Sequence, residues 1–311
     1  MKIQMMAIVL VLLLWVPAGS LAVTYDNLIV FGDSLSDTGN VDFDTSTVKR
    51  DPFTDGKVWV ENLSSALGAN LRNYSYAWAT TDTDASVLGV KDYKLNNLSL
   101  LEHGLLWQVD NFKGNPPGPV PRTPSKSLYS VWAGANDQLL SVFHDLGQLP
   151  LGTENRLASD SANNIGTALD TLYAKGARDF LVPNLPDLGV TPLFDALTND
   201  ETINAYAKSL AAEWSTAFNA LLDAELDAFV ANNAGVNLFK LDTYSLFSPE
   251  VVNAFPELFW TDGLHPSAIG HAGIAQAALA AVQPVPEPST ILLLGCGLLG
   301  VAGYCRKRKQ G

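Results

Sequence analysis

The sequence predicts an α/β fold, namely a three-layer α/β/α sandwich with a mostly parallel central sheet. Short apolar runs of strand length alternate along the chain with longer segments in which apolar residues recur at helical spacing. The short runs are apolar almost throughout, as strands covered by helices on both faces usually are. Strands and helices that alternate in this way form a parallel sheet between two helical layers. In such a sheet, functional loops lie beyond the carboxyl ends of the strands.

Four strands and three helices are expected within one domain, residues 23–284. Stretches rich in proline and glycine, residues 111–124 and 146–155, are interpreted as loops, because strand and helix signals resume directly after each. The longest helix carries an apolar stripe that includes Trp214 and Phe218, which is interpreted as core. The predicted strands are residues 27–31, 128–133, 179–183 and 236–241, and the predicted helices are residues 161–175, 201–232 and 268–282.

Residues 1–22 have the parts of a secretory signal peptide. Lys2 lies near the start, an apolar run follows at residues 7–16, and small residues lead up to Ala22. An uncleaved membrane anchor is the alternative, but the run is short for a span that needs about 20 apolar residues. We therefore expect cleavage after Ala22 and export of the chain.

A second sorting signal is expected at the other end, residues 285–311. Pro286, Glu287 and Pro288 precede an apolar stretch, residues 291–304, and then a basic cluster. Basic residues stay on the cytoplasmic side of a membrane, so this order places the body outside the cytoplasm, in the periplasm, at the cell surface or in the extracellular matrix. The segment resembles the PEP-CTERM sorting signal, which implies an exosortase-type processing enzyme as a partner and at least transient anchoring by the apolar helix. An ordinary tail anchor is the alternative.

The composition of the body between these two signals excludes several functional classes. Both cysteines, Cys296 and Cys305, lie in the tail, so the body has neither a disulfide framework nor a cysteine nucleophile. The chain is 47% apolar, which lets a body of roughly 260 residues bury a core. The net charge is −13, and the body is more acidic still because the basic cluster lies in the tail. This acidity argues against a nucleic-acid partner and is interpreted as an aid to solubility.

The first candidate for chemistry is Ser34, which comes directly after the first predicted strand. It stands in a segment, residues 31–40, that reads Phe-Gly-Asp-Ser-Leu-Ser-Asp-Thr-Gly-Asn. A serine at the carboxyl end of a strand is exposed, and a turn that opens a helix there directs N–H groups toward a developing negative charge. The alternative is a serine that only caps a helix. On this segment alone the two interpretations stay close.

The second candidate is Asn136, in the segment Gly-Ala-Asn-Asp at residues 134–137, which follows the second predicted strand. An asparagine side chain supplies an N–H donor without a charge and can therefore stabilise an oxyanion that forms only in the transition state. The alternative is a loop turn built from glycine and asparagine. That alternative is weaker because the segment follows an apolar strand.

The third candidate is the pair Asp262 and His265, just before the last predicted helix. A separation of three residues in a turn can place the carboxylate beside the imidazole, which would orient the ring and stabilise its protonated form. The chain has four histidines, and only this one follows an acid at that spacing. His271 is interpreted as a surface or packing residue, and His103 and His144 have no evident partner in the sequence.

Together these segments resemble the GDSL, or SGNH, hydrolases over most of the chain. Ser34 stands in the family's Gly-Asp-Ser-Leu block, Asn136 in its Gly-x-Asn-Asp block, and Asp262 and His265 in its Asp-x-x-His block, in the family's order. The resemblance implies a flavodoxin-like sandwich and a serine hydrolase with Ser34 as nucleophile, His265 as base and Asp262 as its partner. It also implies an oxyanion hole that includes the backbone N–H of Ser34 and the side chain of Asn136.

Two further segments, residues 55–61 and 182–189, look like parts of the family's lipase-like branch. In that branch a glycine in a segment similar to residues 73–80 donates a backbone N–H to the oxyanion hole, and here Trp78 stands at that position. Any residue except proline keeps this donor. If the position needs a positive φ, a bulky residue there costs about 1–3 kcal/mol, and the indole would narrow the pocket.

The resemblance implies an exported serine esterase or lipase that hydrolyses carboxylic esters through an acyl-serine intermediate. A lipid ester is favoured by the lipase-like segments, and an acylated carbohydrate by the usual association of the sorting signal with exopolysaccharide. This choice stays open. The alternative from another class is a surface-attached binding or adhesion protein that keeps the fold but has lost turnover, and Trp78 is the residue that motivates it.

No cofactor and no metal are expected. Gly295, Gly297 and Gly300 match the dinucleotide fingerprint, but they lie inside the apolar tail, where small residues favour helix packing. The sequence contains neither a His-Glu-x-x-His motif nor a Gly-x-Ser-x-Gly elbow. Asp82 and Asp84 are interpreted as parts of a solvated loop.

Overall fold

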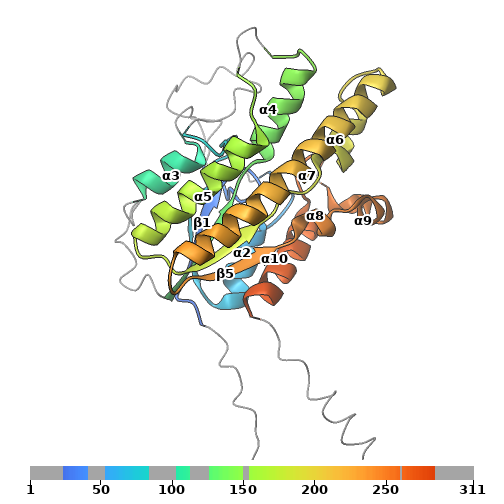
Figure 1. The fold of residues 1–311 in the computed structure, drawn as a ribbon. Helices are drawn as coiled ribbons and strands as arrows, with labels where there is room; N and C mark the ends of the chain where they lie inside the picture. Colours follow the sequence, from blue (N-terminus) through green and yellow to red (C-terminus); the bar gives the residue numbers. More distant parts are fainter. Residues whose placement is uncertain are drawn as a thin grey trace, which may run out of the picture. The chain divides into compact units, whose positions relative to one another are not determined.

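Five parallel strands form a single sheet in the order β2-β1-β3-β4-β5 (Figure 1). The computed structural model describes residues 24–40, 53–83, 103–112, 126–149, 154–259 and 261–283. Four of the strands lie where the sequence predicts them, within one or two residues at each end. The strands are β1 (Asn27–Gly32), β2 (Asn70–Asn73), β3 (Ser127–Trp132), β4 (Asp179–Pro183) and β5 (Asn237–Leu241).

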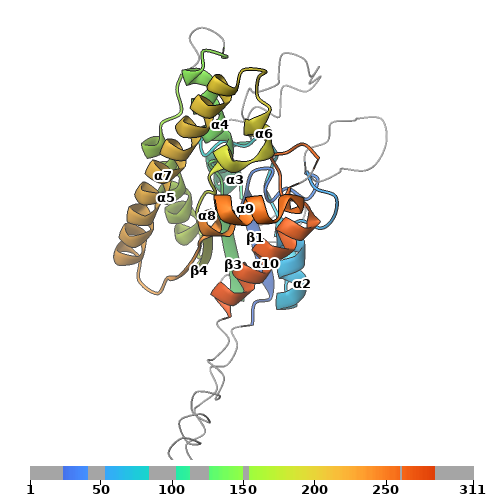
Figure 2. The same ribbon diagram turned by 90° about the vertical axis from the view of Figure 1, so that its right-hand side faces the viewer.

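Helices cover both faces of the sheet, which confirms the predicted three-layer sandwich. One layer contains α3, α5 and α7 with α4 beside them, and the other contains α2 and α10, as Figure 2 shows from the side. The described helices are α2 (Trp59–Leu67), α3 (Leu105–Asn111), α4 (Ala135–Asp145), α5 (Ala158–Ala174), α6 (Pro192–Asp195), α7 (Glu201–Asn232), α8 (Thr243–Leu246), α9 (Pro249–Ala254) and α10 (Ala268–Val282), with the short 3₁₀ turns η3 (Leu188–Val190) and η4 (Pro256–Leu258).

The two central strands, β1 and β3, are buried along their whole length. They pair in register from Asn27 with Ser127 to Gly32 with Trp132, so their carboxyl ends lie at the same level. All six residues of each strand are buried, as is typical of parallel strands between two helical layers. Residues that follow these two strands therefore meet at one edge of the sheet.

The local sequence of helix α7 determines where the helix begins and which of its faces is buried. Asp200 caps its start, because one carboxylate oxygen accepts from the N–H groups of Thr202 and Ile203. Its buried residues recur at helical spacing and include Trp214 and Phe218, whose rings stack at 5.2 Å between centroids. The predicted range of residues 201–232 and the assignment of this stripe to the core are both confirmed.

The sequence did not predict β2, α2, α3 or α4. The strand β2 reads Asn-Leu-Arg-Asn and lies at the edge of the sheet, where its residues are exposed or half-buried. An edge strand does not need the apolar run of a central strand, and strands are predicted from the sequence by that run. We expect residues 134–137 in a functional loop beyond the end of the second predicted strand, but Ala135 begins α4. Only its first residue, Gly134, lies outside the helix, with φ at 127°.

Within the described residues, no helix is both long and apolar enough to cross a membrane. The predicted signal peptide, residues 1–22, and the predicted sorting segment, residues 285–311, lie outside the described residues, as do both cysteines. Residues 24–282 form one compact unit. The expected domain limits at residues 23 and 284 stay predictions.

Candidate active site

The carboxyl ends of β1 and β3 form the centre of the candidate site. The sheet changes direction here, because β2 lies on one side of β1 whereas β3, β4 and β5 continue on the other. Such a switch point leaves a crevice beyond the strand ends, where ligands bind in doubly wound sheets. Ser34 follows β1 and Asn136 follows β3, and both side chains line one pocket at this crevice.

Ser34 stands in a tight turn that the backbone makes immediately after β1. Glycine is required two residues earlier, because a Cβ atom on Gly32 would lie 2.0 Å from the carbonyl oxygen of Trp132. The N–H of Asp37 donates to the carbonyl of Asp33 at 3.0 Å and closes the turn. We expected that a helix could open here. Instead the chain makes one turn and continues without a helix to residue 40.

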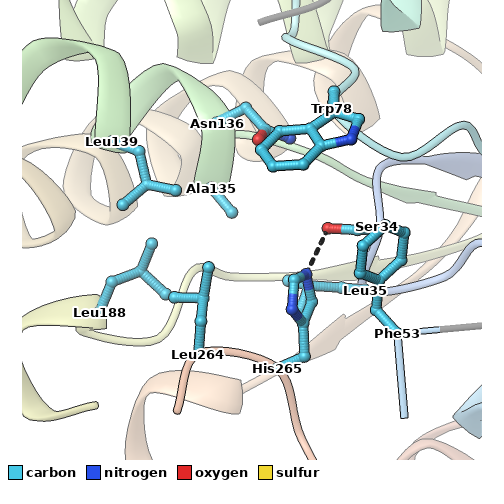
Figure 3. A pocket seen from close by; sticks show the side chains of 10 residues that line it. All are labelled: Ser34, Leu35, Phe53, Trp78, Ala135, Asn136, Leu139, Leu188, Leu264 and His265. Carbon is cyan, nitrogen blue, oxygen red and sulfur yellow. Dashed lines mark hydrogen bonds between the residues drawn. The ribbon is translucent and has the colours of Figure 1, made fainter. Parts of the chain in front are cut away.

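Ser34, His265 and Asp262 form a continuous path of hydrogen bonds, of which Figure 3 shows the first. The Ser34 Oγ lies 2.8 Å from Nε2 of His265, and the Nδ1 of that ring lies 2.5 Å from Oδ2 of Asp262. A carboxylate can only accept, so Nδ1 carries the proton and Nε2 is free to accept from the serine. The structure thus brings together three predicted residues, although Ser34 and His265 are 231 positions apart in the sequence.

Asp262 is held by the turn that also presents His265. Its other carboxylate oxygen accepts from the N–H groups of Leu264 and His265, at 2.9 and 3.0 Å. Partial burial opposes ionisation, but the hydrogen bond and charge of the His265 ring together with the two N–H groups outweigh it and lower the pKa of Asp262. The Asp262 side chain is 32% exposed and that of His265 is 9% exposed. A negative charge is therefore fixed on the far side of the imidazole from the serine.

Asn136 lies in the first turn of α4, not in a loop as expected. Its side-chain amide donates to the carbonyl of Ala79 at 2.9 Å, which ties α4 to the turn that carries Trp78. An amide group has two N–H donors, and this bond uses one of them. Because the side chain is only 4% exposed and lines the pocket, its second N–H is available to a ligand oxygen.

Trp78 has φ at 68° and is the one residue other than glycine with a positive φ among the residues that the structure describes. It occupies the third position of a turn in which the N–H of Ala79 donates to the carbonyl of Tyr76 at 3.1 Å. Glycine or asparagine is favoured at such a position. The carboxylate of Asp37 holds the turn by accepting from the N–H of Ala77 at 2.8 Å. The strain considered from the sequence is therefore present, and neighbouring side chains stabilise it.

The pocket has an apolar end and an aromatic end, with Ser34 and His265 near the latter (Figure 3). The ring of Phe53 packs on the His265 imidazole at 4.8 Å and edge-to-face on Trp78 at 6.3 Å between centroids. The enclosed space is about 390 Å³ and opens in part to solvent. The apolar lining residues have no role that their residue type in the sequence predicts; they are Leu35, Phe53, Ala135, Leu139, Leu188 and Leu264.

Two buried carboxyl groups lie behind the pocket, on the residues next to Ser34 and Asn136. Burial raises the pKa of Asp33 to about 7, and the nearby charge of Asp137 adds to this, although the N–H of Leu35 opposes it. Burial also raises the pKa of Asp137 to about 6, against the donors Thr81 and Ser161. One oxygen of Asp33 is buried without a hydrogen-bond partner within the described structure. Neither Asp33 nor Asp137 is among the residues that line the pocket.

The remaining histidines lie away from Ser34. His144 pairs with its exposed neighbour Asp145 at 3.0 Å, and His103 packs against Tyr76 and Trp107. His271 is buried in α10, and burial lowers its pKa to about 3.

Asp82 forms an ion pair with Arg156 at 3.5 Å, and Asp84 lies outside the described residues. Over the described part of the chain, no group of three or more histidine, cysteine, aspartate or glutamate side chains could hold a metal ion.

Known proteins with similar sequences include esterases and lipases. An acetylesterase from Thermothelomyces thermophilus is 28% identical over 243 residues, which make up 73% of this chain and 73% of that protein. Lipase 1 from Photorhabdus luminescens is 31% identical over 181 residues, 58% of this chain, and the match spans only 25% of the lipase. Among solved structures, an acetylxylan esterase from Geobacillus stearothermophilus has a TM-score of 0.48 at 17% identity, covering 84% of this chain and 96% of that one.

Two sequence families match the chain itself. The PEP-CTERM protein-sorting motif, a signal of exported proteins, matches residues 284–309, as the sequence suggested. The GDSL-like lipase/acylhydrolase model matches residues 28–278, which is most of the chain and includes Ser34, Asn136, Asp262 and His265. The chain therefore belongs to the GDSL-like lipase/acylhydrolase family and is a hydrolase of ester bonds.

Proposed function

We propose that this chain is an exported serine esterase that cleaves carboxylic esters through an acyl-serine intermediate. The observation that carries the proposal is the path of hydrogen bonds from Ser34 through His265 to Asp262, with the hydroxyl facing a pocket. A serine hydroxyl is a weak nucleophile until a base within hydrogen-bond reach removes its proton. The distance of 2.8 Å between Oγ and Nε2 meets that condition.

In the acylation step, Nε2 of His265 takes the proton from the Ser34 hydroxyl while Oγ bonds to the carbonyl carbon of the ester. The electron pair of the carbonyl moves to its oxygen, and Asp262 stabilises the imidazolium that forms. When the tetrahedral intermediate collapses, the bond to the alcohol oxygen breaks and Nε2 returns its proton to that oxygen. Water then attacks the acyl-serine by the same steps and releases the carboxylic acid.

Three N–H donors are proposed to bind the oxyanion: the backbone groups of Ser34 and Trp78 and the side chain of Asn136. No acceptor for either backbone N–H is present among the described residues. The turn around Trp78 is held by Asp37 and Asn136, so its N–H is preorganised despite the strained φ. Donors fixed before the charge develops need no reorganisation in the transition state.

Export and attachment are proposed from the two ends of the chain. The signal peptide at residues 1–22 would direct export, and an exosortase-type enzyme would process the PEP-CTERM motif, with the apolar run at residues 291–304 as a transient anchor. At the outer surface the ester of a lipid or of an acylated carbohydrate is accessible. The acetylesterases among the relatives favour a short acyl group.

The replacement Ser34→Ala tests the proposal directly. We expect it to lower kcat/KM for nitrophenyl acetate by roughly 10⁴- to 10⁶-fold with an unchanged circular dichroism spectrum, and His265→Ala should act alike. Ser65→Ala, at an exposed serine on α2, is the matched control and should keep full activity. Turnover by Ser34→Ala equal to that of the wild type would refute the assignment.

A fluorophosphonate probe separates this proposal from a binding protein without turnover. Only a serine activated by a base reacts with the probe, so labelling of the wild type that is lost in Ser34→Ala supports the esterase. An unlabelled wild type would instead favour the binding protein.

A further inference from the structure

A second apolar pocket adjoins the pocket that contains Ser34. Its volume is about 320 Å³, beside about 390 Å³ for the first pocket, and both volumes include space open to solvent. Three leucines, Leu35, Leu188 and Leu264, line both pockets. The partition between the two spaces is therefore one layer of side chains thick.

The second pocket offers surroundings suited to hydrocarbon. Trp132, Phe247 and Phe259 contribute large apolar surfaces to it. Its two polar side chains each make a hydrogen bond within the protein: Asp187 accepts from the N–H of Gly189 at 2.8 Å, and Thr191 donates to the carbonyl of Leu188 at 2.7 Å. A methylene chain would displace no protein hydrogen bond there.

In a bound ester, the acyl group is the part that would point toward the partition of Leu35, Leu188 and Leu264. The alcohol oxygen must leave beside Nε2 of His265 to receive its proton, so the acyl group takes a different direction from Ser34. At the end of the first pocket away from Phe53, the lining is entirely apolar and includes Leu139 on α4 and Leu188 (Figure 3). An acyl chain that entered this end would stop against the three leucines.

The partition is fixed rather than free to swing open. Leu188 is 3% exposed and Leu35 is 6% exposed, so both are packed in the core. The backbone N–H of Leu35 donates to Asp33 at 3.0 Å, and that of the half-buried Leu264 donates to Asp262 at 2.9 Å. Close packing against the core holds the side chains of Leu35 and Leu188 in place.

We propose that Leu35, Leu188 and Leu264 set the acyl length, so that this esterase takes short acyl groups, and that removing Leu188 joins the second pocket to the first for longer chains. The inference rests on the proposed function, since it assigns the acyl end of the same site. Leu188 is the residue to change, because Leu35 and Leu264 adjoin Ser34 and His265 in the chain.

The experiment measures kcat/KM for nitrophenyl esters from acetate to dodecanoate. Wild type should lose at least about tenfold between butanoate and octanoate, because the longer chain has no space and each methylene in a fitted pocket is worth roughly 10-fold or more. Leu188→Ala should raise the ratio of octanoate to acetate by at least about tenfold over wild type. Leu188→Met keeps the volume of the partition and should keep the wild-type ratio.

Leu221→Ala is the matched control, because it removes the same atoms from an exposed leucine on α7 that lines neither pocket. In this control, the ratio of kcat/KM for octanoate to kcat/KM for acetate should change by less than about threefold. If Leu188→Ala does not fold, Leu188→Val replaces it, with a smaller shift in the same direction.

Wild type that hydrolyses dodecanoate as well as acetate would overturn the inference and leave the esterase intact. So would an active Leu188→Ala with the wild-type ratio. Wild type that hydrolyses no ester at all would overturn the proposed function and the inference together.

Discussion

Two aspartates near the proposed catalytic pair differ in their surroundings and therefore in their charge. Asp33 precedes Ser34, is fully buried and accepts one hydrogen bond from Leu35, so its pKa rises to about 7. Asp262 precedes His265 by three positions, is 32% exposed at its side chain and accepts from the His265 ring and from two N–H groups, so its pKa falls. Burial that outweighs the hydrogen bonds favours a neutral acid, as in Asp33, whereas donors that outweigh burial preserve the charge, as in Asp262.

The contrast between buried and partly exposed carboxylates also distinguishes two regions of the site, the segments after β1 and β3 and the turn before α10. The turns after β1 and β3 use buried carboxylates as acceptors for the backbone: Asp37 holds Ala77, and Asp137 holds Thr81. The turn before α10 uses a partly exposed carboxylate to hold a ring that must gain and lose a proton. We infer that the first region preserves shape and the second supplies charge, and the predictions below test that division.

The largest effect is expected from Asp262→Asn. The amide cannot stabilise the imidazolium and favours the wrong tautomer of His265, so kcat should fall by roughly 10³- to 10⁴-fold. Asp195→Asn, at an exposed aspartate that pairs with Lys208, is the control and should keep wild-type turnover. Steady-state kinetics on nitrophenyl acetate measures both. A loss of less than tenfold in Asp262→Asn would show that its charge is not needed.

A medium effect is expected from Asp33→Asn, on stability as a function of pH. The folded pKa of about 7 lies above the ordinary value of 3.8, so between these values the folded state holds a proton that the unfolded state releases. The ionisation of Asp33 therefore makes the folded protein less stable as pH rises from 3.8 to about 7. Asp33→Asn removes this contribution. The free energy of unfolding at about pH 4 minus that at about pH 8 should therefore differ between wild type and variant by on the order of 2 kcal/mol.

Urea unfolding of wild type and Asp33→Asn at both pH values makes this measurement. Asp137, with a pKa of about 6, acts with the same sign, and His271, with a pKa of about 3, acts with the opposite sign. His271 is present in both proteins and cancels in the comparison, whereas Asp137 interacts with Asp33, so the measured difference reports the two coupled carboxyl groups together. An identical pH dependence in the two would show that Asp33 is charged in the folded protein.

The smallest effect is expected at Trp78, from two replacements that both keep its backbone N–H. Trp78→Gly should be more stable than Trp78→Ala by about 1 kcal/mol, because glycine adopts the φ of 68° without strain. At Ala66 on α2, where φ is helical, the replacement Ala66→Gly should instead cost about 0.5–1 kcal/mol. Thermal unfolding measures both pairs. Equal stability of the two Trp78 variants would mean that the turn relaxes when the indole is removed.

The sequence predicted the residues that carry motifs, because their spacing follows from local geometry. Asp262 and His265 lie in one turn, so three positions suffice to suggest their contact. The approach of His265 to Ser34 depends on the whole sheet and was predicted only through the resemblance to a family.

The sequence does not identify Phe53 and Leu188 as pocket residues, because they line the pocket only through their place in the folded chain. An apolar residue in a loop looks the same in the sequence whether it lines a pocket or packs in a core. A clue was available for Leu188, which lies in the segment at residues 182–189 that looked lipase-like, but its residue type did not single it out.

The fold was predicted best where strands are buried. The central strands β1 and β3 and the strand β4 are apolar runs, whereas β2 carries two asparagines and an arginine at the sheet edge. The short helices α2, α3 and α4 were missed because each shows too few turns for a periodic pattern to stand out.

The separation of 231 positions between the bonded serine and histidine has a consequence for how the protein is made. The ribosome adds Ser34 231 residues before His265, so a growing or prematurely ended chain carries the hydroxyl without the imidazole that we propose as its base. In the proposed mechanism, the chain therefore hydrolyses no ester until the segment with His265 has emerged and folded beside Ser34.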